Sequence, residues 1–109
     1  MTGFIRDGVN VTADVTERCD VCIVGSGAGG AVLAAGLVEQ GLDVVMLEAG
    51  PAVSASDFTL HERDAYPDLY QDRGGRSTSD LAITIMQGRT VGGSTTVNWT
   101  TCYLSLIHI

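Results

Sequence analysis

The sequence predicts an α/β fold built around a parallel βαβ unit, and three observations predict it. Residues 21–24 form an apolar run that ends at a glycine, residues 28–40 carry apolar side chains at helical spacing, and residues 44–47 form a second apolar run. Short uncharged runs of this kind are typical of strands buried on both faces of a parallel sheet. The order strand, helix, strand within about thirty residues indicates a right-handed crossover. We therefore expect two buried parallel strands joined by one helix.

The predicted helix has a clear apolar pattern and a clear end. Gly41 follows the last periodic residue, where a helix stop belongs. Small alanines accompany the larger apolar side chains on the helix. The larger apolar residues of the helix are Val32, Leu33, Leu37 and Val38.

The flanking segments carry weaker signals. Residues 1–18 are expected to be an N-terminal extension, and the alternation of apolar and polar residues at 9–15 predicts a short half-buried strand there. Ser56 is predicted to cap a following helix, and Pro67 to bound any helix formed in that region. An apolar run at 81–86 predicts a further strand.

Composition bounds the class of protein. With 109 residues the chain is long enough for one compact domain and too short for two. Thirteen acidic against six basic side chains give a net charge of −7, and the basic ones are scattered arginines, so we expect no nucleic-acid partner and no polybasic membrane anchor. Residues 21–38 are uncharged, but glycines interrupt them, and we expect neither a membrane span nor a signal peptide.

Cysteine usage favours a reducing compartment. The cysteines at 19, 22 and 102 cannot form a closed set of pairs, so we expect a cytoplasmic protein. Residues three apart on a strand point to opposite faces, so we interpret Cys19 and Cys22 as buried structural cysteines rather than a zinc or redox site. The other residues with chemical potential are interpreted as surface or packing residues: His61, Tyr66, Tyr70 and Trp99.

The first candidate site is the glycine-rich turn between strand and helix. Residues 25–30 satisfy G-x-G-x-x-G, and Glu48 ends the next strand about twenty residues later. In this fingerprint Gly25 permits the tight turn, Gly27 lets the backbone approach a pyrophosphate, and Gly30 lets the helix lie close to the strand. Glu48 can accept hydrogen bonds from ribose hydroxyls and repels a 2′-phosphate. The sequence therefore predicts binding of FAD or NAD rather than NADP, with a plain glycine turn as the alternative.

The second candidate site is a glycine-rich loop at 88–99, which reads GRTVGGSTTVNW. Its small residues and exposed backbone donors suit a flat or anionic ligand. Together with CDVCIVGSGAGGAVLAAGLVEQGLDVVMLEAGP at 19–51, this loop resembles the glucose-methanol-choline (GMC) family of FAD-dependent oxidoreductases. The resemblance covers residues 19–103. It implies FAD as the cofactor, with the first loop at the pyrophosphate, Glu48 at the adenosine ribose and the second loop against the flavin.

The resemblance also implies the residues of the site. No catalytic residue and no metal ligand is assigned, because the histidine that serves as base in the family lies beyond this sequence. The implied cofactor-binding residues are Gly25, Ser26, Gly27, Ala28, Gly29, Gly30, Glu48, Ala49, Arg89, Val91, Gly92, Gly93, Ser94 and Asn98.

The implied function is oxidation of a small-molecule alcohol to an aldehyde or ketone by hydride transfer to flavin. The implied fold is a Rossmann-like FAD/NAD(P)-binding βαβ unit that is incomplete, with residues 19–103 as the N-terminal part of the FAD-binding domain and inactive alone. Residues 104–109 are interpreted as a non-native tail, because one reading frame of a transposon end used in sequencing libraries encodes the same six residues. An NAD-binding dehydrogenase domain and a non-catalytic nucleotide-binding module are the alternatives.

Overall fold

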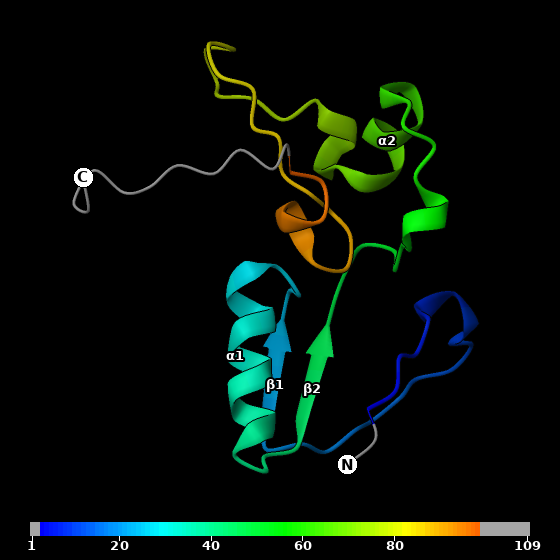
Figure 1. The fold of residues 1–109 in the computed structure, drawn as a ribbon, viewed down its shortest axis with the longest axis vertical. Helices are drawn as coiled ribbons and strands as arrows, with labels where there is room; N and C mark the ends of the chain where they lie inside the picture. The colour runs from blue at the N-terminus through cyan, green and yellow to red at the C-terminus, as the bar shows by residue number, and fades with distance from the viewer. Residues whose placement is uncertain (1–2, 99–109) are drawn as a thin grey trace, which may run out of the picture.

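The computed structural model describes residues 3–98 and contains the predicted βαβ unit (Figure 1). The strands β1 and β2 pair in parallel, in a register that runs from Val21 opposite Val44 to Val24 opposite Leu47. Helix α1 packs against both strands. The elements, in chain order, are η1 (Gly8–Asn10), β1 (Val21–Val24), α1 (Ala28–Glu39), β2 (Val44–Leu47), η2 (Ala55–Asp57), α2 (Glu62–Leu69), η3 (Gln71–Gly74) and η4 (Gly93–Thr95).

Glycines allow the tight connections of this unit. Gly25 follows β1 with a φ of +95°, which an L side chain rarely adopts, and Gly41 ends the α1 region with a φ of +86°. At Gly30, a Cβ atom would overlap the carbonyl oxygen of Gly25 and lie 3.3 Å from Cγ2 of Ile23. Gly30 therefore lets α1 approach β1 closely, as the sequence predicts.

The prediction that both strands are buried on both faces is wrong for the described residues. Ile23, which faces α1, is 7% exposed, whereas Val24 is 84% and Leu47 53% exposed. The reason is that α1 covers one face of a sheet of only two strands. The expectation of buried cysteines fails for the same reason, because Cys22 is exposed on β1 and Cys19 is half-buried; both are free thiols.

The strand predicted at 9–15 is absent, because no other described segment pairs with it. A short 3-10 turn, η1, lies there instead, and Val9 is 88% exposed. The run at 81–86 is also not a strand. It belongs to an arm held by one antiparallel bridge between Ser77 and Thr84, and a single bridge does not build a sheet.

Two predictions about the middle segment are wrong in position. Pro67 lies inside α2 rather than at its boundary: loss of its one N–H donor does not stop the helix there, and α2 continues to Leu69 before it ends. Ser54, not Ser56, precedes η2, where its N–H and hydroxyl donate to the Asp57 carboxylate at 2.6 and 2.8 Å.

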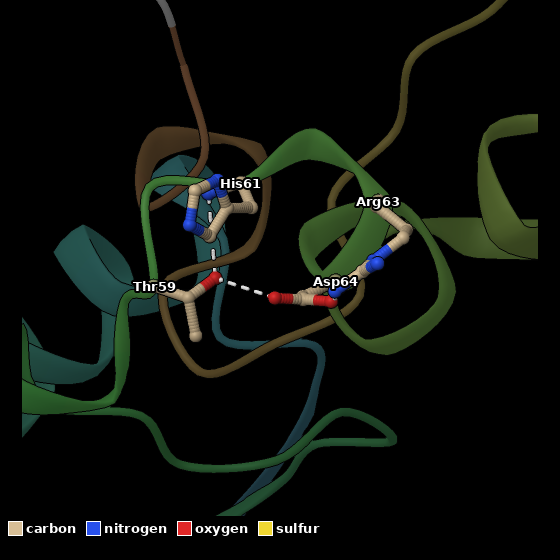
Figure 2. A network of polar contacts seen from close by, with 4 residues as sticks. All are labelled: Thr59, His61, Arg63 and Asp64. Atoms are coloured by element: carbon tan, nitrogen blue, oxygen red, sulfur yellow. Dashed lines mark hydrogen bonds and ion pairs between the residues drawn. The ribbon is translucent and has the colours of Figure 1, made fainter.

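The start of α2 is held by side chains around Thr59 rather than by a serine cap (Figure 2). The Thr59 hydroxyl accepts the N–H of His61 at 3.3 Å and donates to Asp64 at 3.0 Å. Arg63 forms an ion pair with Asp64 at 3.4 Å. His61 is exposed here, as the sequence predicts, and its backbone begins the helix.

Tyr66 and Tyr70 are packing residues, as predicted. Their rings meet edge to face, with centroids 5.3 Å apart. Among the residues that the structure describes, no helix is long and apolar enough to span a membrane. The predictions for Trp99, for Cys102 and for a non-native tail at 104–109 lie outside the described residues.

Candidate cofactor-binding site

The two glycine-rich loops meet at the carboxyl ends of β1 and β2. Figure 1 shows η4 of the second loop above the N-terminal end of α1 and the tips of both strands. A cavity of about 350 Å³ lies between the loops. In parallel α/β sheets, ligands bind at this end of the strands. The predicted site residues that border the cavity are Gly25, Gly27, Ala28, Glu48, Ala49, Arg89, Gly93 and Ser94.

The first loop leads into α1, and the N-terminal end of this helix borders the cavity. Gly27 is the N-cap residue of α1, and no side-chain hydrogen bond caps the helix. The first turn of a helix presents backbone N–H groups and a partial positive charge, both of which suit a phosphate. A Cβ atom on Gly27 would meet no atom of the described chain within 4 Å, so the space beside the loop is open to a ligand.

Glu48 lies directly after β2 and accepts hydrogen bonds from the first loop. Its Oε2 atom accepts the Ser26 N–H at 2.9 Å and the Ser26 hydroxyl at 2.7 Å, and its Oε1 atom accepts the Gly50 N–H at 2.8 Å. Partial burial by itself raises the pKa of the Glu48 carboxyl. The hydrogen bonds from Ser26, Gly50 and Ala49 outweigh it and hold that pKa below its ordinary value. Glu48 is therefore ionised at neutral pH.

Ser26 joins the first loop to the second. Its side chain is buried, and its Oγ atom accepts the N–H of Gly92 at 3.0 Å across 66 residues of chain. The same hydroxyl donates to Glu48. The two loops and the end of β2 thus share one hydrogen-bonded chain.

The second loop is further held by the segment that follows β2. Thr90 is 0% exposed, and its hydroxyl donates to the carbonyl oxygen of Pro51 at 2.7 Å. The same oxygen accepts the Val91 N–H at 3.0 Å. A Cβ atom on Gly50 would overlap the backbone of Arg89 and Thr90, so only glycine allows this close contact.

The glycines of the second loop allow it to turn against the first. Gly92 and Gly93 have φ values of +88° and +58°. A Cβ atom on Gly93 would lie 2.9 Å from Cα of Gly27. Backbone therefore meets backbone where the loops touch, because neither glycine carries a side chain.

The other predicted site residues do not border the cavity. Ser26 is a buried residue of the first loop, and Gly29 and Gly30 lie along α1. In the second loop, Val91 is 40% exposed, and the Asn98 amide donates to the Thr95 carbonyl oxygen at 2.7 Å. Their predicted contacts with a cofactor stay predictions.

Sequence reasoning missed several residues of this site. Gln71, Gln87, Gly88 and Thr95 also border the cavity. Gln71, Gln87 and Gly88 lie there because segments 69–71 and 87–89 pair: the Arg89 N–H donates to the Leu69 carbonyl at 2.7 Å, and the Gln71 N–H to that of Gln87 at 2.8 Å. No sequence motif signals this pairing.

Tyr70 was predicted only to pack, yet it also holds the second loop. Its hydroxyl donates to the carbonyl oxygen of Val97 at 3.0 Å. Burial, with smaller contributions from Tyr66 and Glu62, raises the pKa of Tyr70, so the hydroxyl keeps its proton at neutral pH. Among the described residues, no group of three His, Cys, Asp or Glu side chains is arranged to hold a metal ion.

Known proteins share both loops with this chain. Residues 18–56 match the model of an FAD binding domain, and residues 66–105 match that of a GMC oxidoreductase. A long-chain-alcohol oxidase of Arabidopsis thaliana is 38% identical over 92 residues, which cover 84% of this chain and 13% of the relative. A GMC-type oxidoreductase of Mycobacterium tuberculosis is 46% identical over 90 residues, covering 79% and 14%. No solved structure matches the chain.

A further relative matches a shorter stretch. The 6'''-hydroxyparomomycin C oxidase of Streptomyces lividus is 59% identical over 46 residues, which are 41% of this chain and 8% of that protein. The chain thus spans about an eighth of the length of the alcohol oxidase above, or 13%.

The fold and the paired loops define an FAD-binding part of an oxidoreductase. The chain belongs to the GMC oxidoreductase family, and its cofactor is FAD. This finding decides between FAD and NAD, which the first loop alone left open. The two glycine-rich loops and Glu48 together form a cradle that fits this cofactor. The cradle combines a helix start without a side-chain cap, a glycine with open space beside it and an ionised carboxylate at the strand end.

Proposed function

We propose that this chain holds FAD between its two loops in an enzyme that oxidises an alcohol to an aldehyde or ketone. One observation carries the proposal: two glycine-rich loops, far apart in sequence, border one cavity at the carboxyl ends of parallel strands. Residues 25–30 hold the pyrophosphate, Glu48 holds the adenosine ribose, and the second loop lies beside the flavin.

Each group supplies a different interaction. Gly27 and Ala28 offer backbone N–H groups at the start of α1, and Gly27 leaves room for the pyrophosphate. Glu48 offers a carboxylate to the ribose hydroxyls. Gly93 and Ser94 border the cavity from the opposite side, and Arg89 is the cationic side chain beside it. FAD when bound supplies the acceptor for the hydride that leaves the carbinol carbon.

The alcohol substrate is supported by the relatives. The Arabidopsis proteins that match this chain are named long-chain-alcohol oxidases, and the Streptomyces protein is named an oxidase of a hydroxylated compound. We therefore propose a CH–OH donor. No catalytic base is assigned within this chain, so the residues here position the cofactor and do not transfer the substrate proton.

Substitution of Gly27 tests the cofactor site. In Gly27→Val, the branched side chain fills space that the pyrophosphate needs, and we expect loss of FAD retention. Gly36→Val is the matched control, because Gly36 also has open space around its Cβ position but lies away from the cavity. FAD titration of the folded apoproteins measures the difference. Equal FAD content in the two variants contradicts the assignment.

A separate experiment tests the reaction. The FAD-loaded full-length enzyme that contains this chain is mixed anaerobically with a primary long-chain alcohol, and the visible absorbance of the flavin is followed. We expect bleaching that slows when the carbinol carbon carries deuterium, because hydride transfer breaks that C–H bond. Retention of the oxidised flavin spectrum with primary and secondary alcohols contradicts alcohol oxidation and leaves the cofactor site intact.

A further inference from the structure

Ser26 occupies an unusual place between the two loops. It is 4% exposed, although it lies in a loop that borders an open cavity. Its Oγ atom lies 3.0 Å from the Gly92 nitrogen and 2.7 Å from Oε2 of Glu48. Its own N–H adds a second hydrogen bond, 2.9 Å long, to the same Oε2 atom.

The direction of these hydrogen bonds is fixed by chemistry. The Gly92 N–H can only donate, and an ionised Glu48 carboxylate can only accept. The Ser26 hydroxyl has one proton, which must go to Glu48, and its lone pairs face Gly92. The chain therefore runs one way, from the Gly92 N–H through Ser26 to Glu48. Successive hydrogen bonds of this kind polarise one another.

We propose that Ser26 is a positioning residue that couples the two FAD loops. Its hydroxyl, held by the Glu48 carboxylate, fixes the position of Gly92 in the second loop. This inference rests on the proposed function of both loops. It has a consequence for Glu48. Two hydrogen bonds from Ser26 occupy Oε2, whereas Oε1 accepts one, from the Gly50 N–H, so Oε1 is the oxygen that a ribose hydroxyl reaches without displacing Ser26.

Other anchors allow this coupling to be tested without detaching the second loop. The Thr90 hydroxyl and the Val91 N–H still hold the loop to the Pro51 carbonyl when the Ser26 hydroxyl is removed. In Ser26→Ala the backbone N–H of residue 26 still reaches Glu48. The variant thus removes only the link from Gly92 to the carboxylate.

The experiment compares Ser26→Ala with Ser54→Ala in the FAD-binding protein. Ser54 is the matched control, because its hydroxyl also donates to a carboxylate, that of Asp57, but away from the cavity. We expect Ser26→Ala to raise the dissociation constant for FAD about tenfold, as suits loss of a hydrogen bond to a charged group. We also expect faster hydrogen exchange at the Gly92 amide, with the amides of β1 and β2 unchanged. Ser54→Ala changes neither measurement.

A double-mutant cycle separates coupling from a general structural effect. Ser26→Ala and Glu48→Gln are combined, and FAD affinity is measured for all four proteins. If Ser26 acts through Glu48, the double variant loses less affinity than the product of the two single losses. Losses that multiply overturn the proposal, as does an unchanged dissociation constant in Ser26→Ala.

A second measurement applies if Ser26→Ala does not fold. Glu48→Gln keeps the side-chain size but weakens the acceptor, and the proposal requires faster exchange at the Gly92 amide, which does not touch Glu48 directly. Unchanged exchange there overturns the coupling. Failure of the proposed function gives a different result: Gly27→Val then retains FAD, whereas failure of the coupling alone leaves Gly27→Val without cofactor.

Discussion

The glycines at the start of α1 differ in which atoms an added Cβ would meet. At Gly27 the space is open toward the cavity, and at Gly30 it is filled by the backbone of the preceding turn. Gly29 lies between them, and a Cβ atom there would meet no other atom within 4 Å. The first two glycines of G-x-G-x-x-G therefore serve the turn and the ligand side, and the last serves packing.

Substitution of Gly30 is expected to destabilise the fold itself. The added methyl in Gly30→Ala overlaps the Gly25 carbonyl oxygen, so helix and turn must separate, at a cost of about 1 to 3 kcal/mol in the free energy of unfolding. Gly29→Ala is the control and is expected to stabilise the helix by up to about 1 kcal/mol. Urea unfolding of the full-length enzyme without FAD measures both. Equal stability of the two variants contradicts close packing at Gly30.

The charge of Glu48 predicts a pH dependence whose sign follows from its lowered pKa. In the unfolded chain the carboxyl titrates near 4.5, and in the folded chain below it. Its stabilising contribution is therefore complete above pH 4.5 and is lost as the pH falls through the folded-state pKa. Hydrogen bonds also lower the pKa values of Asp57 and Asp80, so wild type alone does not isolate Glu48.

Comparison with Glu48→Gln isolates this carboxylate. We expect the variant to bind FAD more weakly at neutral pH, by about 1 to 3 kcal/mol. The difference between the two proteins should shrink as the pH falls below 4.5, because Glu48 becomes neutral. FAD titration across this pH range provides the measurement. A difference that stays constant to low pH shows that the charge of Glu48 has no role.

At the scale of elements, the second loop is attached by backbone carbonyls of other segments. The carbonyl oxygen of Pro51 accepts two hydrogen bonds from it, and that of Leu69 accepts one. Tyr70 at the end of α2 donates to the Val97 carbonyl. The residues after β2 and the end of α2 thus hold the second loop in position. They do so by individual hydrogen bonds and not by the pairing of strands.

Thr90→Val tests the attachment made by a buried hydroxyl. The substitution keeps the shape of a side chain that is 0% exposed and removes its hydroxyl. The Pro51 carbonyl retains the Val91 N–H, so we expect a loss of about 0.5 to 1.5 kcal/mol in the free energy of unfolding. Equilibrium unfolding measures the change. An equally stable variant, with unchanged exchange at the Val91 amide, contradicts the role of Thr90.

At the scale of the whole molecule, few apolar side chains are buried. Ile23 and Leu69 are the buried apolar residues among those described, whereas Val24, Val32 and Leu47 are more than half exposed. A sheet of two strands with one covering helix leaves its other face and both edges open. The described residues thus hold a cofactor cradle without a large core.

Residues 1–103 expressed alone are therefore expected to unfold with weak cooperativity, to bind a hydrophobic dye and to oxidise no alcohol. A stability of only about 5 to 15 kcal/mol is usual even for complete domains, and little apolar burial is present here to supply it. Calorimetry, FAD titration and alcohol-dependent dye reduction test the three points. A sharp thermal transition together with tight FAD binding and turnover contradicts the expectation that this unit is incomplete.

The cytoplasmic location and the domain bounds of 1–18 and 19–103 stay predictions.

Local sequence patterns predict the βαβ unit and the positions of both glycine-rich loops. Helical spacing across 28–40, apolar runs on either side and the glycine pattern at 25–30 are local signals, and the structure contains the elements they predict. Sequence also placed Glu48 at the end of β2, because strand length and helix length fix that position. The strands predicted at 9–15 and 81–86 failed, because a strand needs a partner and local alternation does not supply one.

The way in which the two loops meet depends on contacts between residues far apart in the sequence. The contacts of Gly92 with Ser26, of Thr90 with Pro51 and of Tyr70 with Val97 join residues 66, 39 and 27 positions apart. No local pattern encodes such pairs, because each depends on where the chain returns after β2 and α2. The same long-range geometry buries Ser26 within the first loop and brings its hydroxyl to Glu48. A serine at a variable position of the glycine fingerprint thereby becomes the link between the two loops.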